Sequence, residues 1–212
     1  MGVQKELIYG KIVSVIIMKL DEFVNILQKN TPCVIAIDGS SGSGKTTLAA
    51  ILKENYNALV FHMDDYYLHP SRKTDERMAQ PGGNVDYERM LKEVFTHIKD
   101  PYIPSHFFNC DTNELEQRPL FKKQNIIVIE GVYSLLPILR PFYDYTIYLN
   151  INRKNQHERI LKRSNPEILE QFKTEWIPLE DHYLSHFDIK SIADIVLESS
   201  LNFREIFVPV VL

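Results

Sequence analysis

Hydrophobic residues gather in short runs along this chain, and many of them are β-branched. Such runs recur at 33–37, 59–63, 126–129, 145–151 and 192–197. Several are nearly continuous in apolar residues rather than alternating, which is typical of parallel strands covered on both faces. We therefore predict a strand at each of these places.

Helical spacing fills the intervals between the predicted strands. Apolar stripes are formed by Met90, Leu91, Val94, Phe95 and Ile98, by Ile168, Leu169, Phe172 and Trp176, and by Leu20, Phe23, Val24 and Leu27. Strands that alternate with amphipathic helices indicate an α/β fold, with a parallel sheet and helices on both sides. In such sheets, ligands bind at the carboxyl ends of the strands.

The 212 residues suit one α/β domain with a substantial core, which we place at 31–212. We expect residues 1–30 to form a leader: an edge strand or a disordered segment, followed by a short helix. The apolar run Ile12–Met18 is much shorter than the roughly 20 residues that span a bilayer. Met18 is an alternative start.

Composition narrows the class of protein. The content is 44% hydrophobic and 25% charged, as in soluble globular proteins, and the net charge of -4 argues against a nucleic-acid surface. Cys33 and Cys110 lie in no metal-binding or redox pattern, which suits a reducing cytosol. We expect a cytoplasmic protein without nucleic-acid or membrane partners, and leave open whether it forms homo-oligomers.

The stretch IAIDGSSGSGKTTLA (35–49) lies between the first predicted strand and a helical run. Its spacing matches G-x-x-x-x-G-K-[ST], and this context separates it from a flexible linker. Backbone N–H groups of such a loop cradle phosphates, the lysine reaches the β- and γ-phosphates, and the hydroxyl ligates Mg²⁺. We predict that the phosphates of a nucleoside triphosphate bind to Gly39, Ser40, Ser41, Gly42, Ser43, Gly44, Lys45, Thr46 and Thr47, and leave open from the motif whether the nucleotide is ATP or GTP.

Acidic residues follow the next two predicted strands: Asp64 and Asp65 after the second, Glu130 after the third. Near a triphosphate, carboxylates hold Mg²⁺ or accept a proton from a substrate hydroxyl. Alone, any one of them could simply cap a helix or turn. Their convergence on a phosphate loop favours function.

Motifs of other nucleotide-binding classes are missing from the chain. GTP switches carry D-x-x-G and N-K-x-D, and transport ATPases carry a segment like L-S-G-G-Q; none of these strings occurs. A small-molecule phosphotransferase needs an acceptor pocket instead. The long interval Tyr66–Gln124, rich in aromatic residues, Gly, Pro and His, provides room for one.

The ordered segments GSSGSGKTT, MDDYY, PGGNVDYERM, VIEGVYSL and FKTEWIPLEDHY resemble the uridine kinase and phosphoribulokinase group of P-loop kinases, especially its bacterial uridine kinase-like branch. The resemblance spans about 31–200. It implies the P-loop kinase fold: a five-stranded, mostly parallel sheet, helices on both faces and a small lid. It also implies Mg²⁺-dependent transfer from ATP to a primary hydroxyl.

The resemblance further implies residue roles. Asp64 is the general base and lies near the metal, which Thr46 and Glu130 support; Lys45 neutralises charge on the phosphates. Tyr67 and Asp86 contact the acceptor. Arg159 and Arg163 clamp the phosphates from the lid; the alternative for this basic run is a solvated helix face.

The acceptor expected from the resemblance is a nucleoside such as uridine or cytidine. The chain departs from pyrimidine-reading kinases where His106 replaces a tyrosine, and we assign His106 to substrate binding. The alternatives are a pantothenate-like, nicotinamide-riboside-like or sugar acceptor, or a protein that binds ATP without transferring phosphate.

Overall fold

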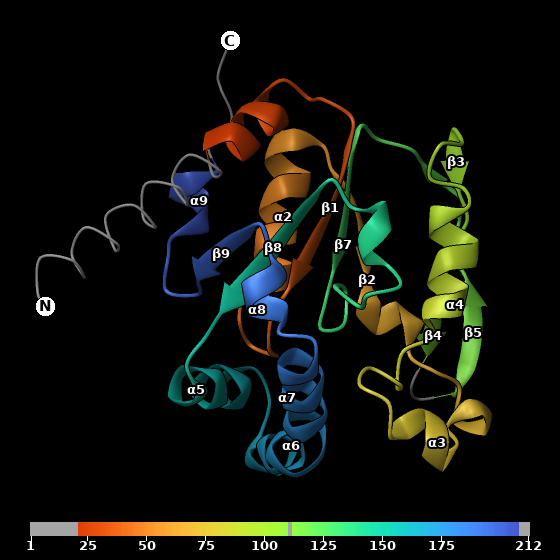
Figure 1. Ribbon diagram of the computed structural model, residues 1–212, viewed down its shortest axis with the longest axis vertical. Helices are drawn as coiled ribbons and strands as arrows, with labels where there is room; N and C mark the ends of the chain where they lie inside the picture. Colours follow the sequence, from red (N-terminus) through yellow and green to blue (C-terminus); the bar gives the residue numbers. More distant parts are fainter. Residues whose placement is uncertain (1–20, 110–111, 208–212) are drawn as a thin grey trace, which may run out of the picture.

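The computed structural model describes residues 21–109 and 112–207 (Figure 1). Its centre is a five-stranded sheet in the order β2-β7-β1-β8-β9, with every neighbouring pair parallel. The strands are β1 (Cys33–Asp38), β2 (Leu59–His62), β7 (Ile126–Glu130), β8 (Tyr145–Asn150) and β9 (Ile195–Glu198). The predicted α/β class and parallel sheet are confirmed.

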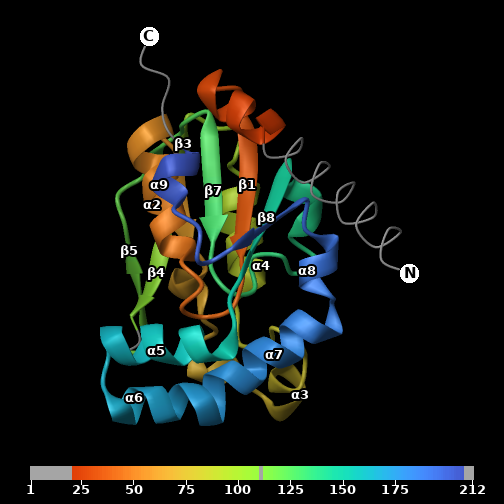
Figure 2. The same ribbon diagram turned by 90° about the vertical axis from the view of Figure 1, so that its left-hand side faces the viewer.

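Helices cover both faces of this sheet (Figures 1 and 2). Against one face pack α2 (Lys45–Tyr56), the helix at 21–28 and α9 (Phe203–Ile206). Against the other pack α4 (Tyr87–Met90), the following π-helix η3 (Leu91–Phe95), α7 (Ile177–His186) and α8 (Ile189–Ile192). Successive strand residues contribute to opposite cores: Ile35 and Ile37 to the first, Ala36 to the second.

Two of the predicted strands extend into residues that form helices, and the strand predicted at 145–151 ends one residue early, at Asn150. The second strand ends at His62, and Met63 begins a 3₁₀ helix, η1 (Met63–Tyr66). Ile192 ends α8, so the last strand begins only at Ile195. Met63 is nonetheless buried in the core. The apolar run therefore predicted correctly that Met63 is buried, but not that it lies in a helix rather than in a strand.

The apolar stripes differ in what they bury. Met90 and Val94 are fully buried, as are Phe23 and Leu27 of the N-terminal helix, and Cys33 is buried as expected. The stripe at 168–176 forms α6 (Pro166–Gln171) and the π-helix η5 (Phe172–Trp176), but neither contains a buried residue. Leu20 and the run Ile12–Met18 lie outside the described residues.

The interval between β2 and β7 contains small elements that the sequence did not predict. They are the 3₁₀ helix η2 (Pro70–Arg72), α3 (Asp75–Met78), and two antiparallel pairs, β3 (Tyr102–Ile103) with β6 (Phe121–Lys122) and β4 (His106–Asn109) with β5 (Glu114–Gln117). A further 3₁₀ helix, η4 (Arg140–Phe142), precedes β8. No helix in the described part of the chain is long and apolar enough to cross a bilayer.

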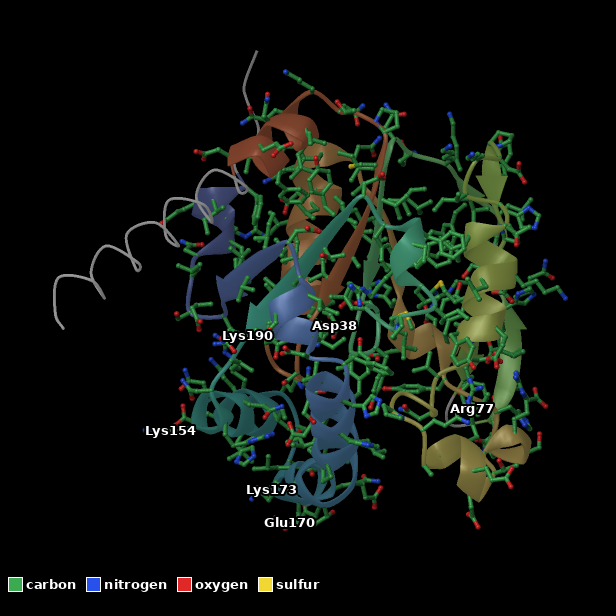
Figure 3. All side chains as sticks on the ribbon, in the orientation of Figure 1. Asp38, Arg77, Lys154, Glu170, Lys173 and Lys190 are labelled. Atoms are coloured by element: carbon green, nitrogen blue, oxygen red, sulfur yellow. The ribbon has the colours of Figure 1, made fainter. Side chains whose placement is uncertain are left out.

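At the carboxyl edge of the sheet lies a layer formed by α5 (Arg153–Arg163), α6 and η5, which leads into α7 (Figures 1 and 2). Its outer side carries Lys154, Glu170 and Lys173, which project away from the sheet (Figure 3). Only Ser164 and Asn165 separate α5 from α6, and the Asn165 side chain caps α6. This compact helical segment stands where the small lid was predicted.

Candidate active site

The glycine-rich loop joins β1 to α2, as its motif requires. Gly39, Gly42 and Gly44 have φ angles of 144°, 79° and 102°, in the region that favours glycine. At Gly39 a Cβ atom would lie 2.4 Å from the carbonyl oxygen of Leu149. A side chain there would push β8 away, so the first glycine is needed for close backbone approach.

A cavity of about 480 Å³ opens beside this loop, within the size range of small-molecule sites. From the loop and α2 it is lined by Ser41, Gly42, Gly44, Lys45, Thr46 and Thr47. The strand ends add Asp64 and Glu130, and α5 adds Arg159 and Arg163. The structure thus brings together groups that the sequence places more than a hundred residues apart.

Lys45 and Thr46 make contacts inside the loop region. The Lys45 Nζ donates to the carbonyl oxygens of Gly39 (2.7 Å) and Ser40 (3.1 Å). The Thr46 hydroxyl donates to Glu130 Oε1 at 3.1 Å. His62 Nδ1 lies 2.6 Å from the same oxygen, and this hydrogen bond raises the pKa of His62.

The donors at this point suit Mg²⁺. A hydroxyl and a carboxylate that contact each other, with Asp64 in the same cavity, offer hard oxygen ligands. No group of three or more His, Cys, Asp or Glu in the described ranges could hold a metal ion by itself. In proteins, Mg²⁺ is usually bound by one or two carboxylates together with substrate phosphates.

The adjacent acids Asp64 and Asp65 diverge. Asp64 faces the cavity, Tyr67 donates to its Oδ1 at 3.3 Å, and burial raises the pKa of its carboxyl group. Asp65 instead pairs with Arg118, whose Nη2 lies 2.8 Å from Oδ1. The two side chains therefore have different partners, although both acids lie in the single η1 turn that follows β2.

Asp86 and His106 have protein partners. Asp86 is buried, caps α4 through the Arg89 N–H (3.1 Å), and accepts a bond from Arg72 Nη1 at 2.7 Å. His106 Nδ1 lies 2.9 Å from Glu93 Oε1. Neither residue lines the described cavity. Their roles in substrate binding remain predictions.

The two basic residues of α5 lie at the cavity in different ways. Arg159 donates to the carbonyl oxygens of Gly42 (3.1 Å) and Ser199 (2.7 Å), and so bridges the phosphate loop and the segment after β9. Arg163 stacks over the ring of Phe172 at 5.5 Å. Lys162, between them, does not line the cavity.

Several site residues were not found from the sequence. The cavity wall beyond the sheet is formed by Ser199, Leu201, Asn202, Phe203 and Arg204. Tyr133, which directly follows the cavity-lining Val132, is buried with a φ of 76°, an uncommon conformation for a bulky residue. Nothing in a single sequence predicts the unusual backbone conformation of this tyrosine. The cavity residues at 199–204 directly follow the last strand, and the rule that ligands bind at the carboxyl edge of a parallel sheet could have predicted them.

Asp38, at the end of β1, was also missed. It is fully buried and accepts hydrogen bonds from the N–H groups of Gly39 (2.6 Å) and Leu135 (2.9 Å) and from the Tyr183 hydroxyl (2.7 Å). Burial raises the pKa of its carboxyl group to about 6. Figure 3 shows Asp38 in the interior, near the edge of the sheet where the loop begins.

A parallel sheet whose first strand enters a glycine-rich phosphate loop, with carboxylates and arginines facing that loop, is the fold of P-loop kinases. A solved structure of a possible uridine kinase from Bacillus stearothermophilus agrees, with a TM-score of 0.63 and 25% identity over 84% of this chain and 97% of that chain. No family model matches the sequence.

Sequence relatives point to the same group. The chain is 28% identical over 182 residues to uridine-cytidine kinase A of Dictyostelium discoideum, covering 78% of this chain but 36% of that protein. It is 24% identical to a uridine kinase of Latilactobacillus sakei (84% and 90% covered) and to a pantothenate kinase of Shewanella pealeana (80% and 60%). The predicted fold and the predicted resemblance to uridine kinase-like P-loop kinases are confirmed.

Proposed function

We propose that this protein is an ATP- and Mg²⁺-dependent kinase that phosphorylates the primary hydroxyl of a neutral small molecule, a nucleoside such as uridine or cytidine. The observation that carries the proposal is the single cavity where Lys45, Thr46, Asp64 and Glu130 meet. These side chains match the requirements of phosphoryl transfer, in which catalysis is positioning and charge stabilisation.

The proposed mechanism assigns a task to each group. Asp64 accepts the proton of the acceptor hydroxyl, and its raised pKa makes it a stronger base. Lys45, Arg159 and Arg163 stabilise negative charge on the phosphoryl group in transit. Thr46 and Glu130 would hold Mg²⁺, which would neutralise further negative charge of the nucleotide.

The charge of the acceptor side supports a neutral acceptor. All four arginines between Tyr66 and Gln124 have carboxylate partners: Arg72 with Asp86, Arg77 with Glu88, Arg89 with Glu93, and Arg118 with Asp65. An anionic acceptor that bound to one of these arginines would have to compete with its carboxylate partner, and would lie in a site that also holds the carboxylate of Asp64. Like charges placed together cost several kcal/mol.

Two alternatives lead to different results. The first is a kinase of another small alcohol, such as pantothenate, nicotinamide riboside or a sugar; a relative named pantothenate kinase supports the pantothenate form of it. A protein that uses ATP only as a ligand would bind it without releasing ADP in response to any acceptor.

The test is ADP release with acceptors matched in shape but not in charge: uridine against its 6-carboxylate, orotidine, and panthenol against pantothenate. We expect the highest kcat/KM for uridine or cytidine, and a loss of at least about a hundredfold for the carboxylated member of each pair. A higher kcat/KM for pantothenate than for every nucleoside would establish the kinase of another small alcohol. ATP binding without acceptor-dependent ADP release would reject the kinase.

A further inference from the structure

Glu180 of α7 contacts the phosphate loop directly. Its Oε2 accepts the main-chain N–H of Ser41 at 2.9 Å, and its Oε1 accepts the Ser41 hydroxyl. The two residues are 139 positions apart in the chain. Glu180 is 4% exposed, and no ion pair joins it to a basic residue in the described ranges. Both oxygens of this buried carboxylate thus serve one residue of the loop.

A second residue on the same face of α7 supports the start of the loop. Tyr183, one turn after Glu180, donates to Asp38, whose other oxygen accepts the Gly39 N–H. On the opposite side, Arg159 of α5 holds the carbonyl oxygens of Gly42 and Ser43. Helices α5 and α7, which flank α6 and η5, therefore hold the loop at successive positions.

A buried carboxylate at this place is costly in two ways. It loses its hydration, which raises the pKa of Glu180, and it adds negative charge beside a site for triphosphate. Hydrophobic burial alone would be served better by an apolar side chain. The two hydrogen bonds from Ser41 to Glu180 offset this cost by fixing the conformation of the phosphate loop. The loop needs such contacts because its glycines and serines offer almost no side-chain packing that would define its shape.

We propose that Glu180 is a positioning residue for phosphoryl transfer, which acts through Ser41 to fix the first half of the phosphate loop against α7. A preorganised loop presents its N–H groups to the phosphates without rearrangement during the reaction. The effect on transfer rests on the proposed kinase function, whereas the effect on nucleotide binding does not.

The test compares Glu180→Ala, Glu180→Gln, Ser41→Ala and the double variant Glu180→Ala/Ser41→Ala. The matched control is Asp181→Asn, which changes the next acid of α7, an exposed side chain paired with Arg153. Two quantities are measured for each: ADP affinity by calorimetry, and kcat with the best acceptor.

We expect Glu180→Ala to lower kcat at least about tenfold and to weaken ADP binding. Glu180→Gln should stay within about threefold of the wild type, because its carbonyl oxygen accepts the Ser41 N–H and its amide can donate to the hydroxyl. The double variant should be no worse than Glu180→Ala alone, since the two residues act together. Asp181→Asn should match the wild type.

Three results would overturn the proposal: Glu180→Ala with wild-type kcat and ADP affinity, Glu180→Gln as impaired as Glu180→Ala, or independent effects of Glu180→Ala and Ser41→Ala. If Glu180→Ala does not fold, Ser41→Ala decides, because it removes the hydroxyl half of the contact and must still lower kcat. If the wild type phosphorylates no acceptor, the kinase proposal fails, and ADP affinity across the same variants still tests the loop contact.

Discussion

Replacing Asp38 by Asn should change how the stability of the protein depends on pH. Asp38 is fully buried, receives three hydrogen bonds and has no cation within hydrogen-bonding distance in the described structure. Burial is the main reason that its pKa rises from 3.8 to about 6. The folded protein therefore holds this proton more tightly than the unfolded chain does.

The sign and size of the effect follow from linkage. Between about pH 4 and pH 6 the folded state binds more protons at this site, so the free energy of unfolding falls as the pH rises. The stabilisation is fully present below about pH 4 and is lost as the pH passes through 6. A difference of about two on the pKa scale corresponds to about 3 kcal/mol.

Urea unfolding of the wild type and of Asp38→Asn at several values between pH 4 and pH 8 measures this contribution. The amide does not titrate, and it leaves one N–H without an acceptor, which lowers stability by about 1–3 kcal/mol at every pH. From pH 4 to pH 7 the wild type should lose about 2.5 kcal/mol relative to the variant, because a small part of the effect is already lost at pH 4. All other titrating groups are shared, so they cancel in the difference.

Tyr183→Phe provides a second measurement, because the Tyr183 hydroxyl lowers the pKa of Asp38. Its removal should extend the pH-dependent loss to higher pH. Stability curves of the wild type and Asp38→Asn that run parallel to within about 0.5 kcal/mol would show that Asp38 ionises as readily in the folded protein as in the unfolded chain, and the reasoning would be refuted.

Three further predictions concern the site. Lys45→Ala should lower phosphate transfer by at least about a hundredfold, because the β- and γ-phosphates lose their mobile cation; ADP release within a few-fold of the wild type would contradict the assignment. Asp64→Asn should retain ATP binding but lower transfer by at least about a hundredfold. Asp65→Asn, which weakens the ion pair with Arg118, should reduce thermal stability more than transfer, and the reverse outcome would make Asp65 the base. Replacing Arg159 or Arg163 by Ala should lower kcat more than it raises the KM for ATP, and an unchanged kcat in both variants would favour a purely structural role for these arginines.

The phosphate loop and its surroundings could be predicted from the sequence because their physics is local. The turns of the loop require positive φ angles, which glycine adopts most easily, and the helix that follows begins at Lys45. Both features depend only on residues that are adjacent in the sequence. Acids that follow parallel strands reach one edge of the sheet by topology alone. For that reason Asp64 and Glu130 could be placed beside the loop without coordinates.

Local patterns did not distinguish between elements that bury the same residues. Met63 and Ile192 belong to apolar runs that predicted strands, but both residues lie in short helices. The stripe at 168–176 does form helices, but none of its residues is fully buried. Apolar spacing reports that a side chain leaves water, whereas the neighbouring elements decide how far it is buried.

Only the tertiary structure decided which polar groups meet. Asp86 could cap a helix or hold a substrate, and the position of Arg72 beside it is what the structure added. The contact of Glu180 with Ser41 and the hydrogen bonds of Tyr183, Asp38 and Gly39 join residues from opposite ends of the chain. Such contacts depend on how α7 packs across the end of the sheet. Spacing along the sequence carries no information about that packing, because each partner is an ordinary polar residue in its own segment.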